Sequence, residues 1–331
     1  MPRLVIHGGC GLIIKKNFTE PGQENAYKEV LRTSLLNGFA VLSNSGSALE
    51  ACIKSVVTME DSPLFNAGKG SVYTKEKTIE CDSGIMDGRT GLAGGVSTLK
   101  TVKNPILAAN EVMRRTPHAL LCGAGAEEFA QSCSLELVPK EYFKTERRLK
   151  QVENFLSTQN EQSLKPILDH SATIENNNAK NQFQENPSIS FKKEDETVGT
   201  VGAVALDAAG SLAAGSSTGG MTGKLPGRVS DSSVAGAGFF ADSRVAVSMT
   251  GNGDSIIRHG SSRRVADLME LGGLTLEKAS EKVIQWELKR WDADAGLIAV
   301  DSDGNFAMPF NTPGMFRGTI DENLEPVVEI W

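Results

Sequence analysis

The bond between Gly199 and Thr200 places the strictest demand on the fold of this chain. It follows a polar tract and opens the apolar run Val201–Leu206, which predicts a buried strand. A threonine hydroxyl within a chain is a weak nucleophile, whereas a threonine freed by cleavage carries its α-amine as a general base. That amine titrates at about 7.7–8. Gly199 does not hinder attack on its carbonyl and tolerates a strained backbone, so the pair fits self-cleavage, although ordinary buried strands also begin this way.

Three glycine-containing blocks downstream favour a catalytic role for the threonine. Thr218 follows eighteen residues later, in Ser217-Thr218-Gly219-Gly220. Arg228 and Asp231 offer one cation and one anion three residues apart, which suits the carboxylate and ammonium of an amino-acid head group. Thr250, with the amide of Gly251, can donate hydrogen bonds to a developing oxyanion.

Together these blocks resemble the N-terminal-nucleophile hydrolases of the plant-type asparaginase (isoaspartyl peptidase) family. The N-terminal half agrees in the same order, and the resemblance covers nearly the whole chain except about residues 150–195. Several ordered blocks are more specific than any single motif. The further blocks that carry it are Ile6–Gly9, Pro63–Gly68, Ile85–Gly88, Lys103–Ile106 and Pro309–Thr312.

The resemblance implies an α/β (α+β) fold, a four-layer αββα sandwich, in one domain of residues 1–331. The chain would cleave itself into residues 1–199 and 200–331. The two parts would stay associated, forming a homodimer of such heterodimers. The implied activity is hydrolysis of the side-chain amide of L-asparagine, of β-aspartyl dipeptides, or of both, with release of L-aspartate through an acyl-enzyme.

The resemblance also implies a role for each block. Thr200 would be the nucleophile, Thr218 would hold its freed amine and hydroxyl, and Asn66 would lie near the scissile bond. Arg228 and Asp231 would bind the substrate head group. Thr250 and Gly251 would form the oxyanion hole, and Gly253 would add a backbone contact. Family members hold a structural sodium through main-chain carbonyls of a loop matching roughly residues 59–69; no other metal and no cofactor is expected.

Two alternatives concern the reactive residue. The triplet Thr-Val-Gly occurs twice, at Thr197 and at Thr200, and the family spacing to Thr218 matches Thr200. Gly215–Gly219 fits the G-x-S-x-G elbow of α/β-hydrolases, but glycines and a proline follow it rather than a helix. Gly123-Ala124-Gly125 similarly lacks the third glycine of a dinucleotide turn, so a close strand–helix turn is the better interpretation.

Two alternatives concern the function. Thr250-Gly251-Asn252-Gly253-Asp254 also resembles glycosylasparaginase, which enters the secretory route, whereas this chain shows no signal peptide. A binding protein that kept the fold without activity is the other alternative. It is disfavoured because every expected reactive position is filled.

Composition excludes several other classes. A net charge of −7 argues against a nucleic-acid partner, and the basic cluster Lys144–Lys150 is interpreted as a solvated helix face. No apolar stretch suits a membrane span, so we expect a cytoplasmic enzyme. The five cysteines lack CxxC spacing and should be reduced and mostly buried. The four histidines lack metal-ligand spacing, and His7 is expected to be a hydrogen-bonded core residue.

Hydrophobic periodicity and turn residues predict the remaining elements. Helices are expected over about residues 25–44, 48–59, 105–115, 126–131, 255–271 and 276–289. Strands are expected over residues 4–7, 119–122, 201–207, 212–216 and 245–250, with a hairpin within 70–95 and a strand pair from 296. Residues from about 154 to 195 are polar and predict a mobile linker.

Overall fold

The computed structural model describes residues 1–18, 20–161 and 199–331. It is a mixed α/β structure, and the predicted fold class is confirmed at that level. The strands are β1 (Arg3–Gly11), β2 (Cys81–Asp87), β3 (Leu92–Leu99), β4 (Leu120–Cys122), β5 (Val201–Leu206), β6 (Leu212–Thr218), β7 (Phe239–Ala241), β8 (Val245–Gly251), β9 (Ala295–Asp301), β10 (Phe306–Ala307), β11 (Gly314–Asp321) and β12 (Val327–Glu329). The helices are α1 (Gln23–Ser43), α2 (Ala48–Glu60), α3 (Pro105–Arg115), α4 (Gly123–Ser132), α5 (Glu146–Glu161), α6 (Gly253–His259), α7 (Ser261–Glu270) and α8 (Leu276–Glu281).

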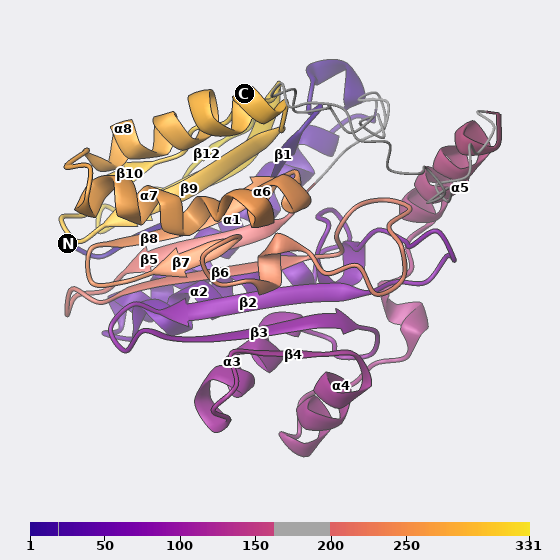
Figure 1. Ribbon diagram of the computed structural model, residues 1–331, viewed down its shortest axis with the longest axis horizontal. Helices are drawn as coiled ribbons and strands as arrows, with labels where there is room; N and C mark the ends of the chain where they lie inside the picture. The colour runs from indigo at the N-terminus through magenta and orange to yellow at the C-terminus, as the bar shows by residue number, and fades with distance from the viewer. Residues whose placement is uncertain (19, 162–198) are drawn as a thin grey trace, which may run out of the picture.

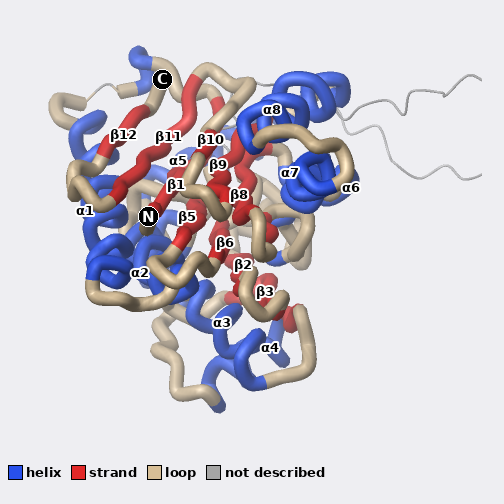
Figure 2. The backbone as a smooth tube through the Cα atoms, turned by 90° about the vertical axis from the view of Figure 1, so that its left-hand side faces the viewer, coloured by secondary structure: helices blue, strands red, loops and turns tan. Residues whose placement is uncertain are grey.

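Two sheets face each other between layers of helices. Within the described ranges, the larger sheet has the order β12-β11-β1-β5-β6-β2-β3-β4 and the smaller one β10-β9-β8-β7. The sheets meet where β5 and β6 pack on β8 and where β1 packs on β9. Helices α1 and α2 cover the outer face of the larger sheet, and α7 and α8 cover the smaller sheet (Figures 1 and 2).

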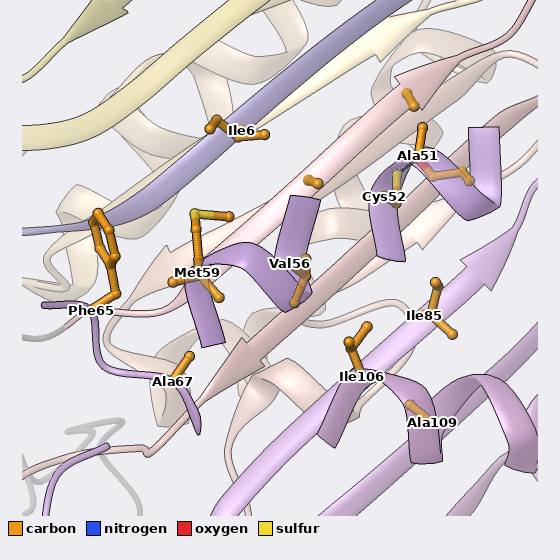
Figure 3. Packing of buried hydrophobic residues seen from close by; sticks show 14 of the residues in the cluster. Ile6, Ala51, Cys52, Val56, Met59, Phe65, Ala67, Ile85, Ile106 and Ala109 are labelled. Atoms are coloured by element: carbon orange, nitrogen blue, oxygen red, sulfur yellow. Dashed lines mark hydrogen bonds between the residues drawn. The ribbon is translucent and has the colours of Figure 1, made fainter. Parts of the chain in front are cut away.

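Apolar side chains fill each interface between layers. Figure 3 shows Val56 and Met59 of α2 packing with Ile6 of β1, and Ile85 of β2 packing with Ile106 of α3. A second cluster lies between the two sheets and contains Val5, Val204, Phe239, Ile298 and Met315. A third lies between the smaller sheet and its helices. Burial of these clusters supplies the main drive for stacking the layers.

Strand β5 lies at the centre of the larger sheet, which explains its continuous apolar sequence. It pairs antiparallel with β1, where His7 is opposite Gly202, and with β6, where Val201 is opposite Ser217. Every residue of β5 is buried. Because neighbouring antiparallel strands run in opposite directions, the start of β5 meets the end of β6. This register brings Thr200 beside Thr218.

Most predicted elements are confirmed, and three expectations need correction. The linker predicted from residue 154 is wrong over residues 154–161, because α5 continues to Glu161; the rest of that prediction lies outside the described residues. The helix predicted over residues 255–271 is two helices separated by Gly260, whose φ of 65° ends the first. The basic cluster is not wholly solvated, since Arg148 is only 5% exposed.

The cysteine and histidine predictions agree with the structure. Cys10, Cys52 and Cys81 are buried, Cys122 is exposed, and all five thiols are free. His7 is fully buried with its Nε2 3.0 Å from Ser248 Oγ. No helix in the described part of the chain has the length and apolar character needed to cross a membrane.

Candidate active site

A chain of hydroxyl contacts surrounds the Gly199-Thr200 bond. Thr200 Oγ1 donates to Thr218 Oγ1 at 3.3 Å, and Thr218 Oγ1 donates to the Gly199 carbonyl oxygen at 3.4 Å. The amide of Gly220 also donates to Thr218 Oγ1, at 3.0 Å. Thr200 is 4% exposed and Thr218 is 1% exposed. The hydroxyl of Thr218 therefore connects the attacking oxygen to the carbonyl that it would attack.

Glycines of β1 and β5 let the backbone approach closely at this point. Gly9 has a φ of 108°, and a Cβ there would lie 2.5 Å from the Cα of Gly199. A Cβ at Gly202 would overlap the His7 ring and Ser248. Burial lowers the pKa of His7 to about 3, so its ring is neutral near pH 7 and is held by Ser248. His7 supports the strand that carries Thr200 rather than supplying charge.

Asn66 fixes the turn that follows Thr218. Its Nδ2 donates to the Gly220 carbonyl at 2.7 Å, and its Oδ1 accepts from the Val72 amide at 3.0 Å. Its own carbonyl accepts from the Gly219 amide at 3.0 Å. The side chain is 2% exposed, and its Cβ lies beside Gly199. Asn66 therefore lies beside the Gly199-Thr200 bond, and its contacts hold the backbone of that turn in place.

A small pocket with a volume of about 10 Å³ lies on the Thr200 side of the bond. It is lined by Thr200, Thr218, Gly220, Met221, Arg228, Ser230, Asp231, Gly251 and Gly253. We call this the head-group pocket. The structure thus gathers most of the predicted site residues around one cavity. Three others lie outside its lining: the fully buried Thr250, and Gly199 and Asn66, which lie on the other side of the bond.

Charges in the head-group pocket are buried and incompletely paired. Arg228 Nη2 forms an ion pair with Asp254 Oδ2 at 3.1 Å. Asp231 has no ion pair among the described residues, although it is only 3% exposed. Burial raises the pKa of Asp231 to about 7, against the opposing effect of Arg228. Within the described chain, Arg228 Nε, Ser230 Oγ and Asp231 Oδ2 are buried without a hydrogen-bond partner. Because unsatisfied buried polar atoms are uncommon in native proteins, this cluster indicates a polar ligand.

The end of β8 forms the opposite wall of the pocket. Thr250 is fully buried, and its Oγ1 accepts from the Cys10 amide at 3.4 Å. Gly251 has a φ of 128°, and a Cβ there would overlap the carbonyl oxygen of Asp294. Gly253 begins α6, and a Cβ there would lie 2.5 Å from Asp231 Oδ1. Both glycines are therefore required by space or by backbone conformation.

The structure adds three residues that the sequence did not single out for a role. Asp254 pairs with Arg228, and Ser230 lines the pocket. Glu60 is fully buried on α2 and accepts from Ser217 Oγ at 2.6 Å, one residue before Thr218. Asp254 and Ser230 lie in the same sequence blocks as the predicted site residues, and this closeness in sequence could have identified them. The sequence held no such signal for Glu60, because Glu60 and Ser217 are 157 positions apart.

Comparison with known proteins gives a consistent answer. Residues 1–329 match the model of a family described as asparaginase. A putative isoaspartyl peptidase/L-asparaginase of Dictyostelium discoideum is 42% identical over 97% of this chain and 94% of that protein. The isoaspartyl peptidase of Escherichia coli (strain K12) is 42% identical over 95% of this chain and 91% of its own. The isoaspartyl peptidase/L-asparaginase of Xenopus laevis is 35% identical over 97% and 93%, respectively.

Proposed function

The chain belongs to the asparaginase family, and from that premise we propose that it is an isoaspartyl peptidase/L-asparaginase that matures by cleaving itself before Thr200. The observation that carries the proposal is the head-group pocket. Its unsatisfied arginine, serine and aspartate atoms lie in the same cavity as two threonine hydroxyls. A free amino-acid head group supplies both charges that such a pocket needs. The facing sheets and outer helices support the finer assignment to an αββα N-terminal-nucleophile fold.

Maturation would begin with an acyl shift. The Thr200 hydroxyl oxygen attacks the Gly199 carbonyl carbon, and the Thr218 hydroxyl, 3.4 Å from the carbonyl oxygen, stabilises the charge that develops there. The hydroxyl proton passes to the Thr200 nitrogen as the bond between Gly199 carbon and Thr200 nitrogen breaks, giving an ester on Oγ1 and a free α-amine. Water hydrolyses the ester, which releases Gly199 as a carboxylate. The result is an N-terminal threonine at the start of β5.

Substrate hydrolysis would then use the new amine. The α-amine accepts the hydroxyl proton while Oγ1 attacks the side-chain carbonyl of asparagine or of a β-aspartyl residue. Thr250 and the Gly251 amide donate to the oxyanion. The proton passes to the departing nitrogen, leaving as ammonia or as a peptide amine. Water, deprotonated by the same amine, hydrolyses the aspartyl ester and releases aspartate.

Head-group recognition follows from the charges. Arg228 would pair with the substrate α-carboxylate, Asp231 and the backbone around Gly253 would receive the ammonium, and Asp254 would orient Arg228. The pocket is small and is lined by both charged groups. Ser230, whose Oγ is unsatisfied, is placed to add one hydrogen bond.

Main-chain carbonyl groups lie close to two glycines of the loop expected to hold sodium. Gly68 packs against the Glu60 carbonyl and Gly70 against the carbonyls of Phe65 and Pro63, so closely that neither position has space for a Cβ. Oxygen ligands suit a hard cation, and the loop carries Asn66. We propose that a sodium ion bound by these carbonyls would stiffen the loop and hold Asn66 against Gly220.

Sheet pairing explains how the two parts would remain together after cleavage. Residues 200–331 contribute β5, β6, β11 and β12 to the same sheet as β1, with β1 paired to both β5 and β11. Separation would expose the buried core between these strands. The homodimer implied by the family is part of the proposal, and light scattering of the mature enzyme measures it.

Kinetics on two substrates test the proposed function. Purified protein should release ammonia from L-asparagine and L-aspartate from β-aspartyl-leucine. Thr200→Ala should abolish both activities, because it removes the attacking oxygen. Thr197→Ala is the matched control and should remain active. A wild-type protein that binds aspartate but turns over neither substrate would favour the alternative of a binding protein.

A further inference from the structure

A second and larger cavity opens on the other side of Gly199. It has a volume of about 460 Å³, which is within the range of small-molecule sites. The end of β1, the start of α1, the Phe65-Asn66 segment, β11 and α5 contribute to its walls. Gly9, Asn66 and Gly199 line it where it approaches the scissile bond. The Gly199-Thr200 bond therefore lies between two cavities of different character.

Aromatic rings form one part of the wall of the larger cavity, from Phe18, Tyr27, Phe65, Phe155 and Phe316. Tyr27 and Phe316 stack with ring centroids 4.6 Å apart and an interplanar angle of 9°. Phe65 meets Tyr27 edge-on at 5.5 Å, and Phe18 meets Tyr27 edge-on at 5.9 Å. These contacts hold the rings in fixed positions. Such a box favours a large apolar group over water.

Two consecutive arginines of α5 complete the lining. Arg148 is 5% exposed, and it donates from Nε to the Gly70 carbonyl at 2.8 Å and from Nη1 to Gln151 Oε1 at 2.9 Å. Arg147 donates to the Tyr27 hydroxyl and to the Leu64 carbonyl. Within the described ranges, neither guanidinium has a carboxylate within 4.0 Å.

A buried cation that has only neutral acceptors is unfavourable. Burial, together with the adjacent charge of Arg147, lowers the pKa of Arg148 to about 9. Lys150, which also lines the cavity, is different because it pairs with Glu146 at 2.7 Å. The arginine pair is thus the part of the wall where an anion would bring the largest gain.

The position of the cavity relates it to the reaction. A substrate with its aspartyl head group beside Arg228 and its side-chain carbonyl at Thr200 directs the departing nitrogen away from the head-group pocket. Asn66 spans the two sides, since it lines the larger cavity and donates to Gly220 of the smaller one. The larger cavity is therefore on the side from which the leaving group departs.

We propose that this cavity is a leaving-group pocket that binds the second residue of a β-aspartyl dipeptide, with a large apolar side chain in the aromatic box and its free α-carboxylate at Arg147 and Arg148. The proposal rests on the proposed function and ranks its substrates. Free asparagine releases ammonia and leaves the pocket to water. The enzyme is thereby specialised for β-aspartyl dipeptides that end in a bulky apolar residue.

Four substrates and three variants test the leaving-group pocket. The substrates are L-asparagine, β-aspartyl-leucine, β-aspartyl-leucinamide and β-aspartyl-glycine. In the wild type, kcat/KM for β-aspartyl-leucine should exceed that for its amide by roughly 10- to 100-fold, as expected for a hydrogen bond to a charged group. It should exceed that for β-aspartyl-glycine by at least about 10-fold.

The variants assign these preferences to the arginines. Arg147→Gln and Arg148→Gln should each bring the ratio between the acid and the amide closer to one. Lys144→Gln is the matched control, because Lys144 lies just before the same helix and outside the cavity lining; with the same charge change, it should keep the wild-type ratio. If Arg148→Gln does not mature, two measurements still test the proposal: the ratio between acid and amide in the wild type, and the same ratio in Arg147→Gln, whose side chain is exposed.

A wild-type ratio near one, or a ratio unchanged in both arginine variants, would overturn the leaving-group pocket. Turnover of asparagine distinguishes failure of the leaving-group pocket from failure of the proposed function. An enzyme that hydrolyses asparagine but does not distinguish the dipeptides contradicts only the pocket, whereas release from none of the four substrates contradicts the proposed function.

Discussion

Arg228 and Asp231 stand three residues apart in the sequence, yet their environments differ. Arg228 forms an ion pair with Asp254, whose side chain is 44% exposed. Asp231 has no ion pair among the described residues and is 3% exposed. Residue types and spacing predicted that both belong to one site. Their difference in pairing depends on α6, which brings Asp254 to Arg228, and could not be inferred from spacing.

Replacing Arg228 tests the head-group pocket at the level of one residue. Arg228→Ala should lower kcat/KM by roughly 30-fold to several thousand-fold, because losing one partner of a buried charge pair costs about 2–5 kcal/mol. Arg228→Lys should recover only part of the loss, since an ammonium cannot form a two-pronged contact. Asp254→Asn should have a smaller effect, because Asp254 touches Arg228 rather than the substrate. A matured Arg228→Ala enzyme with normal turnover would remove Arg228 from the site.

The raised pKa of Asp231 predicts a pH dependence. Asp231 must be ionised to receive the substrate ammonium, and its pKa of about 7 means that it becomes protonated as the pH falls below neutrality. The Thr200 α-amine, with a pKa of about 7.7–8, must also lose its proton. The acid limb of log kcat/KM should therefore approach a slope of two in the wild type. Asp231→Asn should reduce that slope to one, and an unchanged slope would contradict this role.

At the scale of elements, the junction between β8 and α6 is the most restrictive part of the site. Strand β8 ends at Gly251, α6 begins at Gly253, and Asn252 caps the helix by accepting from the Ser255 amide at 3.0 Å. This sharp turn places Gly251 in the lining of the head-group pocket. Its backbone conformation, with a φ of 128°, strongly favours glycine.

Gly251→Ala should disrupt that junction. The added Cβ would overlap the Asp294 carbonyl, so the amide moves and kcat falls by about 100-fold or more, as when an oxyanion donor is lost. Gly210→Ala is the control, because Gly210 also has a positive φ but open space around it; its kcat should be unchanged. Steady-state kinetics with circular dichroism measure both. Normal kcat in a folded Gly251→Ala enzyme would exclude this amide from the oxyanion hole.

The sequence predicted a helix or strand well where the residues that define it lie within the element itself. Helix α3 has the predicted bounds because Pro105 occupies its first turn and apolar residues recur on one face. Of helix α5, only the basic face over residues 144–150 was predicted, because the sequence beyond residue 154 is polar. Its apolar anchor, Val152, belongs to a buried cluster with Tyr73, which is distant in sequence. Arg148 was assigned to the surface for the same reason, since its burial depends on the Gly70 loop.

At the scale of the whole molecule, Glu60 connects the helical layer to β6, the strand that ends at Thr218. It accepts from Ser217 Oγ on β6 and from the Ile106 amide at the start of α3. Within the described chain its Oε2 has no partner. Burial raises the pKa of Glu60 to about 8, so the carboxyl is largely protonated at neutral pH and joins the layers as a neutral group.

This raised pKa makes stability depend on pH. The folded state holds the Glu60 proton up to about pH 8, whereas the unfolded chain loses it near pH 4.3. Stability therefore falls as the pH rises between these values, and Asp231 acts in the same direction up to about pH 7. Glu60→Gln should make the melting temperature of the mature enzyme less sensitive to pH between 5 and 8. If the melting temperatures of the two proteins change with pH by the same amount, Glu60 does not titrate in this range.

The pairing of the sheets shows what sequence can and cannot supply for the molecule. Apolar runs predicted the strands, and the family resemblance predicted stacked layers. The order of the larger sheet, with β5 between β1 and β6, depends on contacts between residues about 200 apart. That order explains why Thr200 lies beside Thr218 and between two cavities.

The central claim is that Thr200 becomes an N-terminal nucleophile, and the masses and N-termini of the purified protein test it most directly. Intact-mass spectrometry should find two chains, residues 1–199 and 200–331, and Edman sequencing of the smaller chain should read Thr-Val-Gly-Ala. Thr200→Ala should remain a single chain of 331 residues. A smaller chain beginning at Thr197, or an enzyme that is fully active while uncleaved, would contradict the account.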